Sequence, residues 1–158
     1  MIKKVLIGIV FFIIGFGIAI FAESFFRQLI QDLFQWTTNN GIQFGGKDIY
    51  LFGNPIYFIS FGFALLIFSI VNKKEKIQKI LLHGMIMIII FGILLIGISA
   101  LSANLKIIEC TACDDGIRRL GYNEINYGLI LTISVLLSSI PSMIIIKKRK
   151  KASVQQHI

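Results

Sequence analysis

Residues Asn72 to Lys79 read N-K-K-E-K-I-Q-K and form a strongly charged break in the middle of a largely apolar chain. Charged side chains are costly inside the hydrocarbon core, so the chain must leave the membrane here. Short lysine-rich loops stay on the cytoplasmic side of a membrane. The stretch therefore predicts a cytoplasmic loop at residues 72–79, and its topology-setting lysines are Lys73, Lys74, Lys76 and Lys79.

The composition is that of a membrane protein. The 158 residues are 56% hydrophobic and 15% charged, with a mean hydropathy of +0.82, whereas soluble domains carry about 25% charged residues. Four windows without Asp, Glu, Lys or Arg have about the length that crosses a bilayer, namely residues 5–22, 55–71, 80–101 and 125–146. The sequence thus predicts an all-α integral membrane protein. Its single domain, residues 1–148, is a four-helix transmembrane bundle made of two helical hairpins, and residues 149–158 form a disordered basic tail.

The charges are distributed asymmetrically between the predicted sides of the membrane. Eleven cations and Glu75 fall in the inner segments, a net charge of +10, while the outer loops 23–54 and 102–124 carry five cations and seven acids, a net charge of −2. This asymmetry predicts cytoplasmic termini and attraction of the inner side to anionic lipid, not to nucleic acid. The composition, rich in lysine and isoleucine, favours a multi-pass protein of a bacterial inner membrane. The inner cations are Lys3, Lys4, Lys73, Lys74, Lys76, Lys79, Lys147, Lys148, Arg149, Lys150 and Lys151.

Residues 1–22 fit either a retained helix or a cleaved signal peptide. Two lysines precede an apolar run, and Ala22 supplies a small residue before a cut at Glu23. The long apolar run and the isoleucine at position 20 match a signal peptide poorly. We therefore expect the first helix to be retained.

The first outer loop begins with an amphipathic stretch. Phe26, Leu29, Ile30, Leu33 and Phe34 share one helical face, which predicts either an extension of the first helix or a short amphipathic helix in the membrane interface. Asn39-Asn40-Gly41 is expected to end this helix, since Asn and Gly tolerate a positive φ. The run from Gln43 to Tyr50 is compatible with a small β-hairpin, and Pro55 after Asn54 predicts the start of the second span.

Small and hydroxylated side chains recur at four-residue spacing in the predicted spans. Such stripes let helix backbones approach closely in lipid. We interpret them as packing surfaces within the bundle or between subunits, and a lined ion or solute path is the alternative. Pro141 is expected to bend the fourth helix. The residues of the stripes are Gly15, Ala19, Ser60, Ala64, Gly128, Thr132, Ser134, Ser138 and Ser142.

Cys110 and Cys113 are the two cysteines of the chain and lie in the second predicted outer loop. A disulfide that ties this loop is the first interpretation, because disulfides persist outside the cytoplasm. A redox-active pair is the alternative. Membrane thiol enzymes that relay electrons to a quinone use a second cysteine pair, which this chain lacks. Two thiolates alone underfill a tetrahedral zinc site, so no metal centre is predicted.

Other polar residues have structural interpretations. Glu23 and Glu124, at the outer ends of the first and fourth spans, are expected to form salt bridges with Arg27, Arg118 or Arg119. Asn123 and Asn126 are candidate helix caps. His83 is expected to lie in the inner interface and not in a proton relay, which would need an ionisable partner inside the membrane.

The sequence contains no Ser/His/Asp set, P-loop or paired metal-binding histidines, and it predicts no cofactor. It favours a non-enzymatic binding, accessory or immunity-type module that acts through its outer loops on a protein partner or a second copy. A membrane thiol–disulfide oxidoreductase that uses Cys110 and Cys113 is the alternative. A small transporter or channel subunit is the third hypothesis. It ranks last because transporters usually place polar or broken-helix sites at mid-depth, whereas these spans carry only Ser and Thr there.

Overall fold

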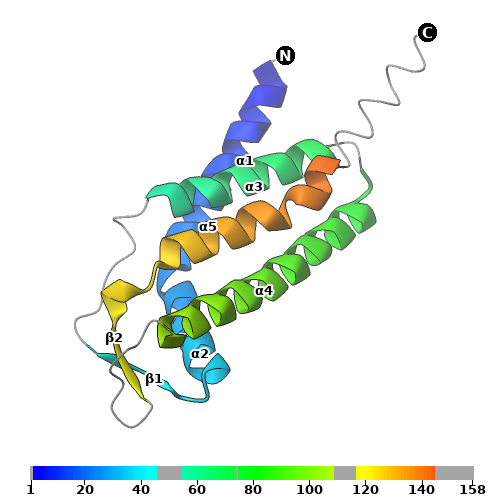
Figure 1. Ribbon diagram of the computed structural model, residues 1–158. Coiled ribbons are helices and arrows are strands. Elements are labelled where there is room, and N and C mark those ends of the chain that lie inside the picture. The colour runs from blue at the N-terminus through cyan, green and yellow to red at the C-terminus, as the bar shows by residue number, and fades with distance from the viewer. Residues whose placement is uncertain (1, 46–54, 74, 109–116, 145–158) are drawn as a thin grey trace.

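The computed structural model describes residues 2–45, 55–73, 75–108 and 117–144, and these residues are mostly helical. Figure 1 shows the elements in chain order by colour. They are the helices α1 (Ile2–Phe21), α2 (Glu23–Thr37), α3 (Pro55–Asn72), α4 (Ile77–Ile108) and α5 (Tyr127–Ser138), the strands β1 (Ile42–Gly45) and β2 (Arg118–Gly121), and the 3-10 turn η3 (Tyr122–Glu124).

Two helical segments are long and apolar enough to cross a membrane, namely α4 and the span Tyr127–Ile144. A third exists if α1 and α2, which meet at an angle of 58°, are counted as one broken span, and α3 is a shorter apolar helix. Only 11% of the apolar window of α4 is buried within the protein. The exposed remainder is apolar surface of the kind that lipid covers.

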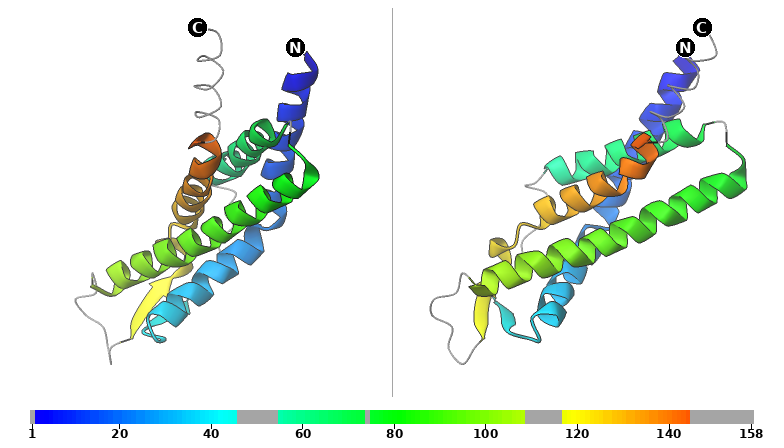
Figure 2. Two further views of the ribbon diagram at one scale, coloured as in Figure 1. Left: turned by 90° about the vertical axis from the view of Figure 1, so that its right-hand side faces the viewer. Right: turned by 45° about the vertical axis from the view of Figure 1, so that its right-hand side comes forward.

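The helices cross in two layers. Figures 1 and 2 show α5 between α3 and α4, while α1 crosses α3 and α2 runs beside α4. The start of α1, the end of α3 and the start of α4 lie toward one end of the molecule, and α2, β1 and β2 lie toward the other. We call α2, β1, β2 and η3 the cap.

The buried apolar core lies at the cap end and joins the cap to the helices. Its members come from all five helices, both strands and the segment before α5, so the cap shares one core with the helices. The cluster comprises Ala19, Ile30, Phe34, Ile42, Tyr57, Phe58, Leu95, Ala103, Leu120, Ile125, Tyr127, Ile130 and Leu131.

A close backbone approach fixes the crossing of α1 and α3. A Cβ atom added to Gly15 would lie 2.5 Å from the Phe61 carbonyl oxygen and 3.0 Å from the Gly62 Cα atom. A Cβ atom on Gly62 would in turn lie 2.7 Å from the Phe12 ring. Only glycine permits this distance at position 15, where the contacted atoms are backbone, whereas a side chain at position 62 would require the Phe12 ring to shift.

A side chain of α3 bonds to the backbone next to the break between α1 and α2. The buried Tyr57 hydroxyl of α3 donates a hydrogen bond of 2.7 Å to the Ala19 carbonyl oxygen. In a straight helix that oxygen would accept from the backbone N–H of Glu23, four residues later. A side chain inserted into the helical ladder is a recognised origin of a sharp kink. The chain turns at Ala22 from α1 into the amphipathic α2. The sequence did not predict the angle of this turn, which is 58°.

α4 is longer than the span predicted at residues 80–101. Its 32 residues extend over about 48 Å at 1.5 Å per residue, more than the hydrocarbon thickness of about 30 Å. The helix continues to Ile108 because the buried positions Leu95, Ser99 and Ala103 keep four-residue spacing into the cap. At its other end, the half-buried His83 hydrogen-bonds through Nδ1 to the Asn72 side-chain oxygen at 2.7 Å, which joins α4 to α3.

Several local predictions are confirmed. α2 is followed by Asn39 and Asn40, with φ angles of 49° and 60°, and α3 begins at Pro55. The Asn126 side chain accepts a hydrogen bond of 3.1 Å from the Leu129 backbone N–H and caps α5. The helix is interrupted at Ser139, just before Pro141, and a further helical stretch covers residues 140–144. Proline has no N–H for the preceding turn, which accounts for the interruption.

Candidate functional site

The cap contains a parallel two-stranded sheet that pairs the two predicted outer loops. Ile42 lies opposite Arg118, and the register continues in steps of one to the Gly45–Gly121 pair. The described strand β1 pairs in parallel with β2, a pairing that the sequence did not predict, and the second strand of the predicted hairpin lies outside the described residues. Residues 46–54 lie outside the described residues. The partner strand belongs to a distant part of the chain, and local turn signals could not identify it.

The two faces of this sheet differ in character. One face is mostly apolar: Ile42 and Leu120 are buried, the Phe44 ring stacks on Tyr122 with the ring centroids 5.7 Å apart, and Arg118 is its polar member. The opposite face carries Gln43 and Arg119, which are exposed neighbours in register. The alternation is that of a sheet with one buried and one solvated side.

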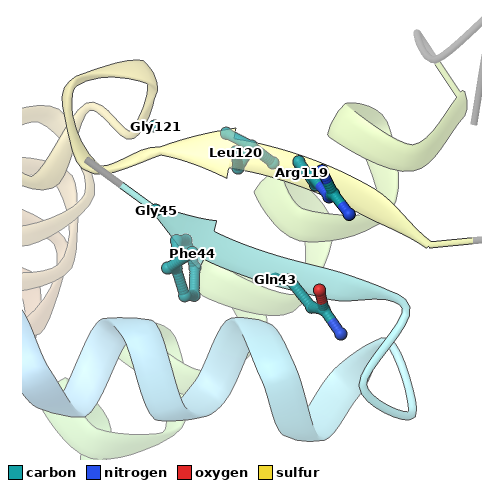
Figure 3. A pocket seen from close by; sticks show the side chains of 6 residues that line it. All are labelled: Gln43, Phe44, Gly45, Arg119, Leu120 and Gly121. Carbon is teal, nitrogen blue, oxygen red and sulfur yellow. The ribbon is translucent and has the colours of Figure 1, made fainter.

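A pocket of about 330 Å³ lies on this sheet, as Figure 3 shows. The next pair after Gln43 and Arg119 is Gly45 and Gly121, so bare backbone lies beside the two polar side chains. A Cβ atom on Gly45 would meet nothing within 4 Å. The pocket is lined by Gln43, Phe44, Gly45, Arg119, Leu120 and Gly121.

The two adjacent arginines of β2 have different environments. Arg118 lies 3.7 Å from Glu124 and also donates to the Lys106 carbonyl oxygen, while Glu124 accepts from the Gly121 backbone N–H at 2.8 Å. Arg119 forms no ion pair within the described part of the chain. Its guanidinium presents a planar set of donors that matches a carboxylate, and the Gln43 amide adds further donors.

A row of polar side chains on α2 forms contacts within this helix and with α5. Glu23, Arg27 and Gln31 follow one another at four-residue spacing, and Glu23 is only 5% exposed although its side chain is a carboxyl group. The Arg27 Nε atom lies 3.9 Å from Glu23, and the Gln31 amide donates to the Tyr127 hydroxyl at 3.0 Å. The predicted salt bridges at Glu23 and Glu124 are confirmed with Arg27 and Arg118 as partners.

The structure places the predicted packing residues inside the protein. Ala19, Ser60 and Ala64 are at most 5% exposed, and Gly15 and Gly128 are buried. The Ser60, Ser134 and Ser138 hydroxyls all donate to carbonyl oxygens of their own helices. The Thr132 hydroxyl oxygen is buried and has no hydrogen-bond partner among the described residues.

Other predicted residues lie apart from the pocket or outside the described residues. Lys73, Lys76 and Lys79 are exposed at the end opposite the cap, where Lys79 lies 3.5 Å from Glu75. Cys110 and Cys113 lie outside the described residues, so the predicted disulfide has no structural support. The same holds for Lys74, Lys147 and Lys148 and for the tail at residues 149–158.

Sequence reasoning did not single out Gln43 and Arg119 as members of one site. The signal that existed was weak: a glutamine and an arginine, each on a short segment next to a glycine. Their adjacency depends on the register between two strands far apart in the chain. Within the described ranges no three His, Cys, Asp or Glu side chains are grouped to hold a metal ion.

A scan against protein-family models found no match, and searches of curated proteins and of solved structures found none either.

Proposed function

We propose that this chain is a four-helix protein of a bacterial inner membrane, with both termini in the cytoplasm, and that its outer cap binds a protein partner without catalysing a reaction. The spans are α1, α3, α4 and α5. The lysine-rich connection between α3 and α4 supports the orientation through the positive-inside rule. Retention of α1 is supported by its packing, because Gly15 and Ala19 belong to its buried contact with α3.

The observation that carries the proposal is the pairing of β1 with β2. Isolated outer loops of a small membrane protein need no common structure, whereas here two loops form one sheet on a shared apolar core. Ordering a segment costs conformational entropy. The apolar face of the sheet offsets that cost, and the opposite face is left with exposed Gln43 and Arg119 and a pocket.

The pocket suits an acceptor group of a protein, such as a side-chain or terminal carboxylate. Arg119 supplies the charge, and Gln43 supplies a neutral donor beside it. Gly45 leaves room for an incoming chain to approach β1 closely, whereas the Asn123 side chain lies beside Gly121. Oriented donors of this kind select a planar anionic group better than a lysine would.

The transporter hypothesis gains no support from the helix stripes. The Ser134 and Ser138 hydroxyls donate to Ile130 and Val135 of the same helix, so these donors are already used within α5. Such back-bonded hydroxyls serve helix packing. The thiol-enzyme alternative rests on Cys110 and Cys113, which lie outside the described residues, and it stays a prediction from the sequence.

Site-specific photo-crosslinking in intact cells tests the proposal. A photoreactive amino acid at Gln43 is expected to give a discrete crosslinked product that survives membrane isolation. Arg119→Glu should abolish that product, because the pocket would then repel a carboxylate. Gly45→Trp should abolish it as well, since a Cβ atom at this position meets nothing within 4 Å and a large side chain there would occupy the pocket.

The matched control carries the same photoreactive group at Ile88, a 70% exposed apolar residue of α4. This position should give only lipid adducts. A product at Gln43 that persists in both Arg119→Glu and Gly45→Trp would overturn the pocket as the binding site. Absence of any protein product at Gln43, with normal amounts of the protein in the membrane, would overturn the proposed function.

A further inference from the structure

A second pocket lies at the C-terminal end of α2, separate from the sheet pocket. Its volume is about 320 Å³. Every lining residue carries a polar or aromatic side chain: Asp32, Gln35, Trp36, Asn39 and Asn40. None of these residues lines the pocket on the sheet.

The electrostatics of this pocket favour a cation. Asp32 is exposed and forms no ion pair with any residue that the structure describes. The C-terminal end of a helix carries a partial negative charge, which basic side chains usually offset. The last turn of α2 contains no basic residue. A carboxylate and a helix C-terminus thus meet in one pocket, and no basic side chain lines it among the residues that the structure describes.

Trp36 gives the pocket an aromatic surface. Its side chain is 70% exposed, although it is the largest apolar group of the cap and adjoins a well-packed core. It lies one helical turn after Asp32, so the two side chains share one face of α2. The face of an indole ring attracts organic cations more strongly than that of any other side chain.

The turn after α2 completes the pocket with neutral acceptors. Asn39 and Asn40 have φ angles of 49° and 60°, and the Asn40 backbone N–H bonds back to the Gln35 carbonyl oxygen at 2.9 Å. This closure holds both asparagines against the helix end. Their side chains and that of Gln35 offer amide oxygens, which accept hydrogen bonds from N–H groups.

We propose that this pocket binds an organic ammonium group, with Asp32 as the counter-charge and the Trp36 ring as the surface against which the cation rests. An exposed tryptophan that served only to anchor the cap in the headgroup layer would need no carboxylate one turn away. The ammonium can belong to a membrane lipid headgroup or to a soluble amine, and both present the same chemistry to the pocket.

The protein provides its own reporter, because Trp36 is the one tryptophan in the chain. The full-length protein in an uncharged detergent is titrated with tetramethylammonium chloride, with sodium chloride at equal concentration as the reference. We expect a saturable change in tryptophan emission with tetramethylammonium alone. Asp32→Asn should weaken the apparent affinity about fivefold to tenfold, as the loss of one nearby charge implies.

Glu75→Gln is the matched control, since it removes the same charge at the opposite end of the molecule. It should leave the titration unchanged. An identical response to both salts would overturn the proposal, and so would an unaltered affinity in Asp32→Asn. Circular dichroism of each variant confirms that the helices are intact. The test is independent of the sheet pocket, so its result does not depend on the crosslinking outcome.

Reconstitution in nanodiscs distinguishes the two sources of the ammonium group. Discs of phosphatidylglycerol alone are compared with discs that also contain phosphatidylethanolamine. If the lipid is the natural ligand, the mixed discs should shift Trp36 emission in the wild type but not in Asp32→Asn, and should suppress the response to tetramethylammonium. If a soluble amine is the ligand, both kinds of disc should keep the full tetramethylammonium response.

Discussion

The crossing of α1 and α3 offers a sharp test of the fold, because two glycines of one helix have opposite surroundings. A methyl group on Gly15 would lie 2.5 Å from the Phe61 carbonyl oxygen and 2.9 Å from its carbon. The same group on Gly17 would meet nothing within 4 Å. Gly15→Ala and Gly17→Ala therefore make the same chemical change on α1 with and without a steric consequence.

The expected cost of Gly15→Ala follows from this overlap. The contacted atoms are backbone, so the helices themselves must separate, by roughly 0.5–1 Å, a gap that forfeits a quarter to a half of each dispersion contact. Overpacking of this kind costs about 1–3 kcal/mol, which is about 5-fold to 150-fold in the folding equilibrium. Gly17→Ala should be neutral or stabilising by up to about 1 kcal/mol, because alanine favours the helix.

Unfolding in mixed micelles measures both variants. The fraction of sodium dodecyl sulfate is raised while far-ultraviolet circular dichroism and proteolytic susceptibility are followed, and the midpoints are compared with the wild type. Gly15→Ala should unfold at a lower fraction, and Gly17→Ala should not. Equal midpoints for the two variants would refute the close approach of α1 and α3.

Two further outcomes follow from the described contacts and the proposed topology. Tyr57→Phe removes the hydroxyl that bonds to Ala19 and should cost about 1–2 kcal/mol, because a buried carbonyl oxygen loses its donor; an unchanged unfolding midpoint would contradict a stabilising role for this bond. A membrane-impermeant thiol reagent should label Cys110 and Cys113 in intact cells after reduction. A cysteine at Lys76 in a cysteine-free variant should react only after permeabilisation, and the reverse pattern would overturn the orientation. Labelling of the natural pair without reductant would show free thiols, whereas labelling that needs a strong reductant would show a disulfide.

Features set by short-range chemistry could be predicted from the sequence. Asn39 and Asn40 adopt the positive φ that asparagine tolerates, Asn126 caps α5, and the helix is interrupted next to Pro141. The salt bridge of Glu23 with Arg27 belongs to the same class, because its partners are one helical turn apart. In each case the cause lies within a few residues of the effect.

Features that join distant segments could not be predicted in this way. The periodicity of residues 42–45 is satisfied equally by a hairpin and by pairing with any other strand, and the parallel register with β2 is decided by the shared core. The kink after α1 lies beside a hydrogen bond from a hydroxyl of α3. The sheet pocket exists only because Gln43 and Arg119 become neighbours, so neither residue carries a recognisable signal alone.

The parallel pairing of β1 with β2 also sets the order in which the molecule can be completed during synthesis. The end of β2 leaves the ribosome roughly 75 residues after the end of β1, which is about 4–15 s later at ordinary elongation rates of 5–20 residues per second. During that interval β1 has no partner strand, and α3 and α4 are still being synthesised. The sheet of the cap therefore cannot form until α3 and α4 have been made, and the core beneath it is completed only by the residues of α5 that follow β2.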